Sequence, residues 1–398
     1  MLSTSVHHMK HGVHSSHVDR EQTMAAAWLD ARIETPALVV DAEIFARNLD
    51  EMTQLARTAG VELLPHAKTH RMLAAGLVQM ERGADGLTVA KVGEAEVFVE
   101  GGVGRIFVAY PLVGEPKARR ALALHQRIDL TLGTDSLPGA SEIGSVFAAA
   151  GQRAKVLLGI DTGLGREGIP PAEAPRIASA IADIDGIKLV GIYTHEGSVY
   201  SAVDRADLVR KATECAKTMV ETATAIRALG IDLPVVSMGA SASARVVALV
   251  PGVTQIRPGI YAFNDVGQLA LGNASLETTS VRVIASVVSH PETDRACIDA
   301  GSKSLGSDLI PASGHRDEYP RHGLVVNEPG WHVENLSEEH GWLKWHGSGA
   351  PSALPVGTRL EIVPNHVCMA FAMLRKATVL RHGAVEEVWQ GMGPGSSE

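Results

Sequence analysis

Short apolar runs alternate with amphipathic segments through the first two thirds of the chain. Eight runs of four to eight residues follow one another from residue 61: Val61–Leu64, Gly86–Ala90, Arg105–Tyr110, Ile128–Gly133, Lys155–Asp161, Lys188–His195, Val235–Gly239 and Thr254–Ile260. The segments between them have helical periodicity, among them Lys91–Glu100, Pro116–Leu124, Leu137–Ala150, Ala172–Ala182 and Ala206–Leu229. Strands that alternate with helices predict a parallel sheet with right-handed crossovers.

The number of apolar runs favours a closed α/β barrel. Eight strand–helix units over about 200 residues suit a (β/α)8 TIM barrel. An open, doubly wound sheet is the alternative, although no Gly-x-Gly-x-x-Gly motif follows the first strand.

After Phe263 the pattern changes to short β-like runs separated by Gly, Pro, Asn and Asp. These runs are Val281–Ser289, Arg295–Asp299, Gly323–Val326, Leu360–Val363 and Glu386–Trp389. They predict a second, mostly β domain of roughly 120 residues. We therefore expect a tail and short helix in residues 1–34, with the helix over 19–33, an N-terminal strand plus the barrel in residues 35–270, and a C-terminal β domain in residues 271–398.

The strand expected at Thr35–Asp41 precedes the eight barrel strands. Pairing with the C-terminal domain is therefore an alternative for this strand. Asp41 can cap a helix that runs to about Thr58, and Gly60 follows as a stop signal.

Composition limits the class of protein. A formal net charge of −9 argues against a nucleic-acid binder. No apolar run approaches the roughly 20 residues that span a bilayer, and the first residues lack the apolar core of a signal peptide. The three cysteines lie far apart, which fits a reducing compartment and predicts a cytoplasmic protein without disulfides. The His-rich residues 1–16 read as a mobile tail, with metal chelation as the alternative.

One lysine lies where the first barrel strand should end. The segment Pro65-His66-Ala67-Lys68-Thr69-His70 follows the run Val61–Leu64, so Lys68 is expected on the C-terminal rim of the barrel. Burial there would lower the pKa of the amine and make it a nucleophile. A surface lysine in a strand-to-helix loop is the alternative.

Two further loops on the predicted rim carry candidate anion ligands. Ser237–Ala244 contains small residues and hydroxyls that let backbone N–H groups approach a phosphate. Asp161–Gly168 places Arg166 in a glycine-rich loop, where a guanidinium can bind a carboxylate or phosphate. A plain turn and a surface arginine are the respective alternatives. A lysine plus a phosphate site on a barrel rim suggests pyridoxal 5′-phosphate.

The C-terminal domain offers a candidate metal site. His366 and Cys368 follow a β-like run, and residues two apart on an extended chain face the same side. An imidazole and a thiolate favour zinc over magnesium or calcium. Two protein ligands would leave coordination positions for water and substrate. A purely structural His-x-Cys pair is the alternative.

Several motifs together resemble the family of D-serine dehydratases and D-threonine aldolases, fold-type III pyridoxal-phosphate enzymes related to alanine racemase. The matching segments run in family order from about residue 35 to 370: Thr35–Asp41, Pro65–His70, Thr88–Glu96, Arg257–Asp265, Asp299–Lys303 and Leu336–Gly341. The resemblance implies a barrel followed by a β domain, and a homodimer with its active sites near the interface. Two departures are the apolar segment Met369–Met373, which puts the substrate side chain in doubt, and Ala242 in place of a common proline.

The resemblance also implies roles for individual residues. Lys68 would hold the cofactor covalently, next to His66. The other expected cofactor contacts are Arg166, His195, Gly239, Ala240, Ser241 and Tyr261, and the expected metal ligands are His366 and Cys368. Aldolases of the family tend to carry His-x-Asp at the metal pair and dehydratases His-x-Cys.

The resemblance therefore favours a lyase that dehydrates and deaminates a β-hydroxy D-amino acid. D-serine is the first choice, with D-threonine and 3-hydroxy-D-aspartate as further candidates, and the products would be a keto acid and ammonia. Retro-aldol cleavage to glycine and an aldehyde is the main alternative. An amino-acid racemase and a non-catalytic pyridoxal-phosphate carrier are the others.

Overall fold

Eight parallel strands form the first domain in the order β2-β9-β8-β7-β6-β5-β4-β3. The computed structural model describes residues 28–310, 319–393 and 396. The strands are β2 (Glu62–Leu63), β3 (Leu87–Val89), β4 (Arg105–Pro111), β5 (Asp129–Thr134), β6 (Ala154–Gly159), β7 (Ile187–Tyr193), β8 (Val235–Met238) and β9 (Gln255–Ile256). Each strand lies within one of the eight predicted runs or exceeds it by a single residue. Strands β4 and β5 end one residue later than their runs, and β6 and β7 begin one residue earlier.

The two ends of this sheet meet and close the barrel. A parallel bridge joins His66 to Thr88, and the Thr88 N–H donates to the carbonyl of Pro65 at 2.8 Å. The Leu63 N–H also donates to the Asp85 carboxylate at 2.8 Å. Strand β6 is buried at five of its six positions, as expected for a strand covered on both faces.

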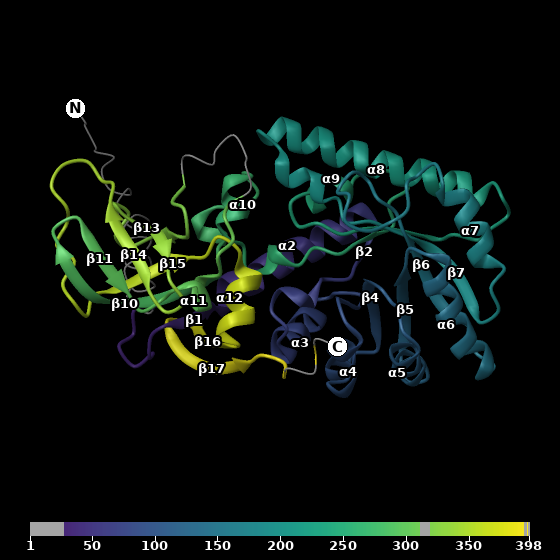
Figure 1. The fold of residues 1–398 in the computed structure, drawn as a ribbon, viewed down its shortest axis with the longest axis horizontal. Helices are drawn as coiled ribbons and strands as arrows, with labels where there is room; N and C mark the ends of the chain where they lie inside the picture. Colours follow the sequence, from purple (N-terminus) through teal and green to yellow (C-terminus); the bar gives the residue numbers. More distant parts are fainter. Residues whose placement is uncertain (1–27, 311–318, 394–395, 397–398) are drawn as a thin grey trace, which may run out of the picture.

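Helices surround the strands. They are α3 (Leu73–Glu81), α4 (Val92–Glu100), α5 (Glu115–His125), α6 (Leu137–Ala149), α7 (Ala174–Ala182), α8 (Arg205–Arg227) and α9 (Ala244–Val247). Figure 1 shows α8 along one side of the barrel and α4, α5 and α6 along the opposite side. The predicted barrel is therefore confirmed, and within the described ranges no helix combines the length and apolar composition needed to cross a membrane.

The second domain is built on a nine-stranded, mostly antiparallel sheet. Its strands are β1 (Ala37–Asp41), β10 (Val281–Glu292), β11 (Arg295–Ile298), β12 (Leu324–Val325), β13 (Trp331–Leu336), β14 (Gly341–Trp345), β15 (Arg359–Val363), β16 (Lys376–Arg381) and β17 (Ala384–Gln390). Short helices accompany it, namely α10 (Val266–Ala270), α11 (Ser302–Leu305) and α12 (Val367–Leu374). Figure 1 shows this domain beside the barrel.

Strand β1 belongs to this second sheet. It pairs antiparallel with β10 and parallel with β16, so the N-terminal strand lies between two C-terminal strands. All five of its residues are buried. The strand expected at Thr35–Asp41 thus pairs with the C-terminal domain, which was the alternative considered for it. The helix predicted over 19–33 falls largely outside the described residues, and after Trp28 the chain forms turns.

Helix α2 (Ala42–Ala59) carries the chain from the second domain to the barrel (Figure 1). The Asp41 carboxylate accepts a hydrogen bond from the Ile44 N–H at 2.7 Å and caps the first turn. Gly60 ends the helix at a φ of 69°, where a residue without a side chain is unstrained. Both predicted ends of this helix are confirmed.

We expect Asp41→Ala to lower the free energy of unfolding by about 1 kcal/mol, because an N-cap carboxylate satisfies an otherwise unpaired helix N–H. Urea unfolding followed by circular dichroism measures the change. Glu221→Ala, on the exposed face of α8, is the control. Equal stability of the two variants would show that the cap contributes nothing.

Candidate active site

Lys68 lies at the C-terminal rim of the barrel. After β2 the chain passes Pro65 and forms a 3-10 turn, η1 (Ala67–Thr69), that carries Lys68. The His66 side chain caps this turn by accepting a hydrogen bond from the Lys68 N–H at 3.5 Å. The local fold therefore directs the lysine away from the barrel interior and into a cleft.

A cavity of about 470 Å³ lies between the barrel rim and the second domain. It brings together most of the residues singled out in the sequence: His66, Lys68, Arg166, His195, Gly239, Ser241, His366 and Cys368. Ala240 and Tyr261 are buried outside its lining. An adjoining cavity of about 760 Å³ shares His66, Lys68 and Arg166 and extends over the ends of β3 and β4.

The surroundings of Lys68 lower the pKa of its amine. Its side chain is exposed within the cavity, where the residues of the cavity walls surround it. This enclosure lowers the pKa of Lys68, and the Arg166 guanidinium acts in the same direction, whereas the Cys368 sulfur opposes it. A lysine with a lowered pKa is a better nucleophile and base at neutral pH.

Two histidines beside Lys68 are neutral. Burial holds the pKa of His66 well below its usual value, and the Lys68 ammonium adds to this effect. Burial and Lys68 likewise lower the pKa of His195 to about 3. His195 Nδ1 lies 3.3 Å from the Gly239 carbonyl oxygen, to which a neutral ring donates its N–H. The second nitrogen of His195 then remains an acceptor.

The predicted phosphate loop holds a protein carboxylate. The fully buried Glu196 accepts hydrogen bonds from the Gly239 N–H at 2.9 Å, the Ala240 N–H at 3.1 Å and the Ser243 hydroxyl at 2.6 Å. The two backbone donors expected to bind an anion are therefore already engaged. The helix that follows, α9, has only four residues.

The Ser241 hydroxyl is the donor that this loop presents to the cavity. Its oxygen accepts from the Gly259 N–H at 3.0 Å and from the Tyr261 N–H at 3.3 Å. Two accepted bonds occupy both lone pairs, so the hydroxyl proton is free to bind an anion. Tyr261 contributes through its backbone N–H, because its side chain is buried outside the cavity lining.

Two glycines leave no room for a side chain beneath this hydroxyl. A Cβ at Gly239 would lie 2.5 Å from the Arg257 guanidinium and 2.8 Å from the Thr194 carbonyl oxygen. A Cβ at Gly259 would lie 2.4 Å from the Thr69 hydroxyl. Both positions therefore require glycine, because neighbouring residues already occupy the space that a side chain would need.

His366 and Cys368 face the cavity from the start of a helix. The extended chain expected across this pair is wrong, because α12 begins at Val367 and His366 is its N-cap. The two side chains nevertheless converge, since His366 hydrogen-bonds Cys368 as well as Asp308, whose carboxylate lies 2.5 Å from His366 Nδ1. Burial alone would lower the pKa of His366, but Cys368 and the neighbouring carboxylates raise it to about 10.

A buried aspartate joins this helix to the barrel. Asp265 accepts from the Gln268 N–H at 3.0 Å and from the Val367 N–H at 3.1 Å, so one carboxylate caps both α10 and α12. Burial raises the pKa of Asp265 to about 6. The loop before α12 is thereby fixed relative to the end of β9.

Sequence reasoning did not single out Tyr200, Asp265 and Asp308 as members of this cavity. Tyr200 comes from a 3-10 turn after β7, where no spacing rule indicates a function. Asp308 lies 58 positions from its partner His366, so only the fold brings them together. Asp265 is the last residue of the segment Arg257–Asp265, whose family resemblance was the sequence signal that could have indicated a role for it.

Two family models match the chain and divide it between them. The model of the alanine racemase N-terminal domain matches residues 40–265, and that of a putative serine dehydratase domain matches residues 280–380.

Known relatives cover nearly the whole chain. The D-threo-3-hydroxyaspartate dehydratase of Delftia sp. is 31% identical over 374 residues, which are 90% of this chain and 97% of the relative. A D-threonine aldolase of Arthrobacter sp. is 30% identical over 370 residues, covering 90% of this chain and 92% of that protein. The solved structure of a D-threo-3-hydroxyaspartate dehydratase, as a cysteine-to-alanine mutant in the metal-free form, has a TM-score of 0.83 at 31% identity and covers 90% of this chain and 98% of that one. The chain therefore belongs to the family of D-serine dehydratases and D-threonine aldolases, whose fold is that of alanine racemase.

Proposed function

We propose that the protein is a pyridoxal-phosphate- and metal-dependent lyase that removes water and then ammonia from a β-hydroxy D-amino acid. One observation carries the proposal: the Lys68 amine and the His366–Cys368 pair open onto the same cavity. A base for the Cα proton and a site for the β-hydroxyl are what a β-elimination requires. Relatives that act on 3-hydroxyaspartate and D-serine support this reaction class.

The described residues fit the cofactor. Lys68 offers an amine of lowered pKa to an aldehyde, and the Ser241 hydroxyl offers a proton to a phosphate. Gly239 and Gly259 line the same cavity and contribute only backbone to it. When bound, pyridoxal phosphate withdraws electrons from Cα and so weakens the bonds to that atom.

The proton step falls to Lys68. Its lowered pKa leaves a larger fraction of neutral amine at neutral pH, and Nζ is then able to take the proton from Cα. His66 and His195 are neutral, so they add no positive charge beside Nζ that would disfavour its protonation. Arg166 lines the same cavity, where the Glu167 carboxylate binds its Nε and Nη2. The remaining N–H groups of the guanidinium would bind the carboxylate that every amino-acid substrate carries.

The donor set at the other end of the cavity fits a zinc-type ion. His366 and Cys368 would hold the metal, and Asp308 would orient the His366 ring through its other nitrogen. Such an ion makes the β-hydroxyl a better leaving group. A relative whose cysteine-to-alanine mutant is described in a metal-free form supports a role for cysteine in metal binding.

We expect metal-dependent ammonia release from D-serine, D-threonine or D-threo-3-hydroxyaspartate. The assay measures ammonia and keto acid from the purified protein with each substrate, with and without EDTA. EDTA should abolish release, and added zinc should restore it. Activity that is indifferent to EDTA would contradict the metal role.

The same assay separates the alternative reactions. Glycine and an aldehyde without ammonia would assign the chain to the aldolases, a function that the relative of 30% identity keeps open. Inversion at Cα without ammonia would indicate a racemase. Bound cofactor without turnover on any substrate would indicate a carrier.

Lys68→Ala should reduce turnover by at least about 1,000-fold, because it removes both the covalent anchor and the base. Borohydride reduction followed by mass spectrometry should attach the cofactor to the wild type and not to the variant. Lys188→Ala, an exposed lysine of β7, is the control and should behave as wild type. Full activity of Lys68→Ala would refute the assignment.

Cys368→Ala should abolish ammonia release while the absorption of the bound cofactor persists, because the metal pair and Lys68 come from different domains. Cys297→Ala, in β11 and outside the cavity, is the matched cysteine control. Unchanged kinetics of the Cys368 variant would show that the metal site has no part in the reaction.

A further inference from the structure

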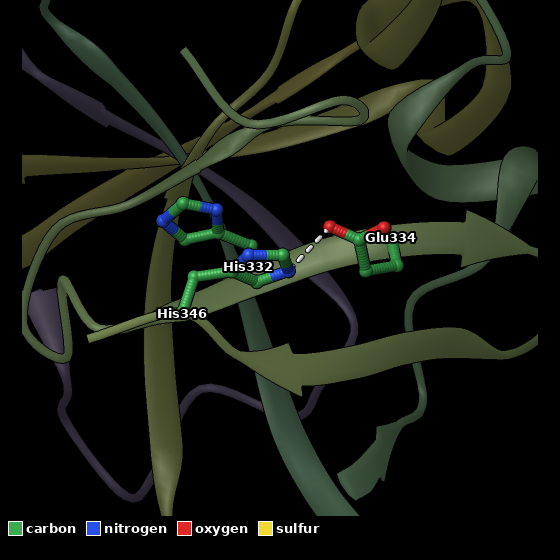
Figure 2. A group of neighbouring side chains, drawn as sticks. All are labelled: His332, Glu334 and His346. Carbon is green, nitrogen blue, oxygen red and sulfur yellow. Dashed lines mark ion pairs between the residues drawn. The ribbon is translucent and has the colours of Figure 1, made fainter. Parts of the chain in front are cut away.

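A second group of metal-binding side chains lies on the β13–β14 hairpin. His332 and Glu334 come from β13, and His346 directly follows β14. One ligand atom from each of the three residues lies within 4.8 Å of the other two. Figure 2 shows the three side chains together, with the ion pair between His346 and Glu334 as a dashed line.

The geometry within the group is close. His346 Nε2 lies 2.8 Å from the Glu334 carboxylate. The rings of His332 and His346 are stacked, with centroids 4.6 Å apart and an angle of 12° between their planes. Because a metal ion lies in the plane of each imidazole that binds it, one of the two stacked rings would turn about its side-chain bonds to share an ion with the other. Two imidazoles and one carboxylate are a ligand combination that zinc accepts readily.

The hairpin places these side chains on one face. His332 pairs with Lys344 in the antiparallel register, so His332 and His346 lie on the same side of the hairpin, and the ion pair with His346 brings Glu334 to that side. The register shifts between Val333 and Asn335, a bulge that re-aims the side chain of Glu334.

The opposite face of the hairpin holds the backbone in place. Trp331 is fully buried and packs against Trp345 with ring centroids 5.7 Å apart. The His346 N–H donates to the Gly330 carbonyl at 2.8 Å, which fixes His346 beside the start of β13. The backbone that carries the three metal-binding side chains is therefore held in place by packing and hydrogen bonds.

The neighbouring charge does not block a cation. Lys344 is on the same face, but its ammonium is drawn to Asp294 at 3.6 Å. The three donor side chains range from half-buried to exposed, so an ion can reach them from solvent.

We propose that His332, Glu334 and His346 form a second metal site, separate from the cavity, that binds Zn²⁺ or a similar divalent transition-metal ion. Three protein ligands leave a position for water. Strand β13 is the terminal strand of its sheet path, and the ion would fasten it to the end of β14. This proposal does not depend on the reaction proposed for the cavity.

The experiment titrates the full-length, metal-stripped protein with ZnCl2 by calorimetry. Zinc bound elsewhere on the chain is common to all variants, so the difference between variants reports this site alone. Glu334→Gln and His346→Gln should each weaken one binding event by more than about 100-fold, because each removes a direct ligand. His382→Ala is the control. His382 lies on a different hairpin and also contacts a carboxylate, since its Nδ1 is 3.4 Å from Glu43.

Hydrogen exchange locates the ion. Zn²⁺ should slow amide exchange in peptides covering residues 331–346 of the wild type and not of Glu334→Gln, while both exchange alike without metal. Turnover of the Glu334→Gln enzyme should stay at the wild-type level, which separates this site from the cavity. Equal zinc stoichiometry in wild type and both variants, or no zinc effect on the hairpin, would overturn the proposal.

Discussion

Contact between aromatic rings at the domain boundary positions the two halves of the active site. Phe263, after the last barrel strand, packs against Phe371 of α12 with ring centroids 4.7 Å apart, and the His70 ring lies 5.9 Å from Phe263. His70 comes two residues after Lys68, and Phe371 lies one helical turn after Cys368. The same cluster therefore holds Lys68 of the barrel and the His366–Cys368 pair of the second domain at a fixed separation. Edge-to-face ring pairs add roughly 0.5–1.5 kcal/mol beyond simple burial.

A buried cation beneath the cavity adds to the effect of burial on the pKa values of two histidines above it. Arg257 donates to the Ser237 hydroxyl and to the Thr194 carbonyl, both neutral acceptors. Burial lowers its pKa to about 10, so the guanidinium stays charged at neutral pH. Its charge contributes to the lowered pKa of both His66 and His195. Burial is the main cause that keeps these two histidines unprotonated, and the charge of Arg257 adds to it.

The barrel could be predicted from the sequence because parallel strands covered on both faces leave continuous apolar runs, as in β6. Helix α12 could not, since its first residues follow a β-run and its sequence is apolar on every side, without helical periodicity. The hairpin β13–β14 was missed because polar and charged residues interrupt its apolar positions. The position of Lys68 on the barrel rim could be predicted, because it is a lone lysine that follows a predicted strand. Glu196 and Asp308 were not, because their roles arise from contacts across 43 and 58 positions of the chain.

The position of β1 has a consequence for the order in which the protein is made. This strand is synthesised first, yet it is completed on one side by β10 and on the other by β16, which ends at Arg381. On the ribosome, one edge of β1 stays unpaired until β10 has emerged, and the other until β16 has emerged. Contacts of such high sequence separation form slowly. All eight barrel strands precede β10 and can pair during translation, so the cavity between the two domains is the last part of this fold to take shape.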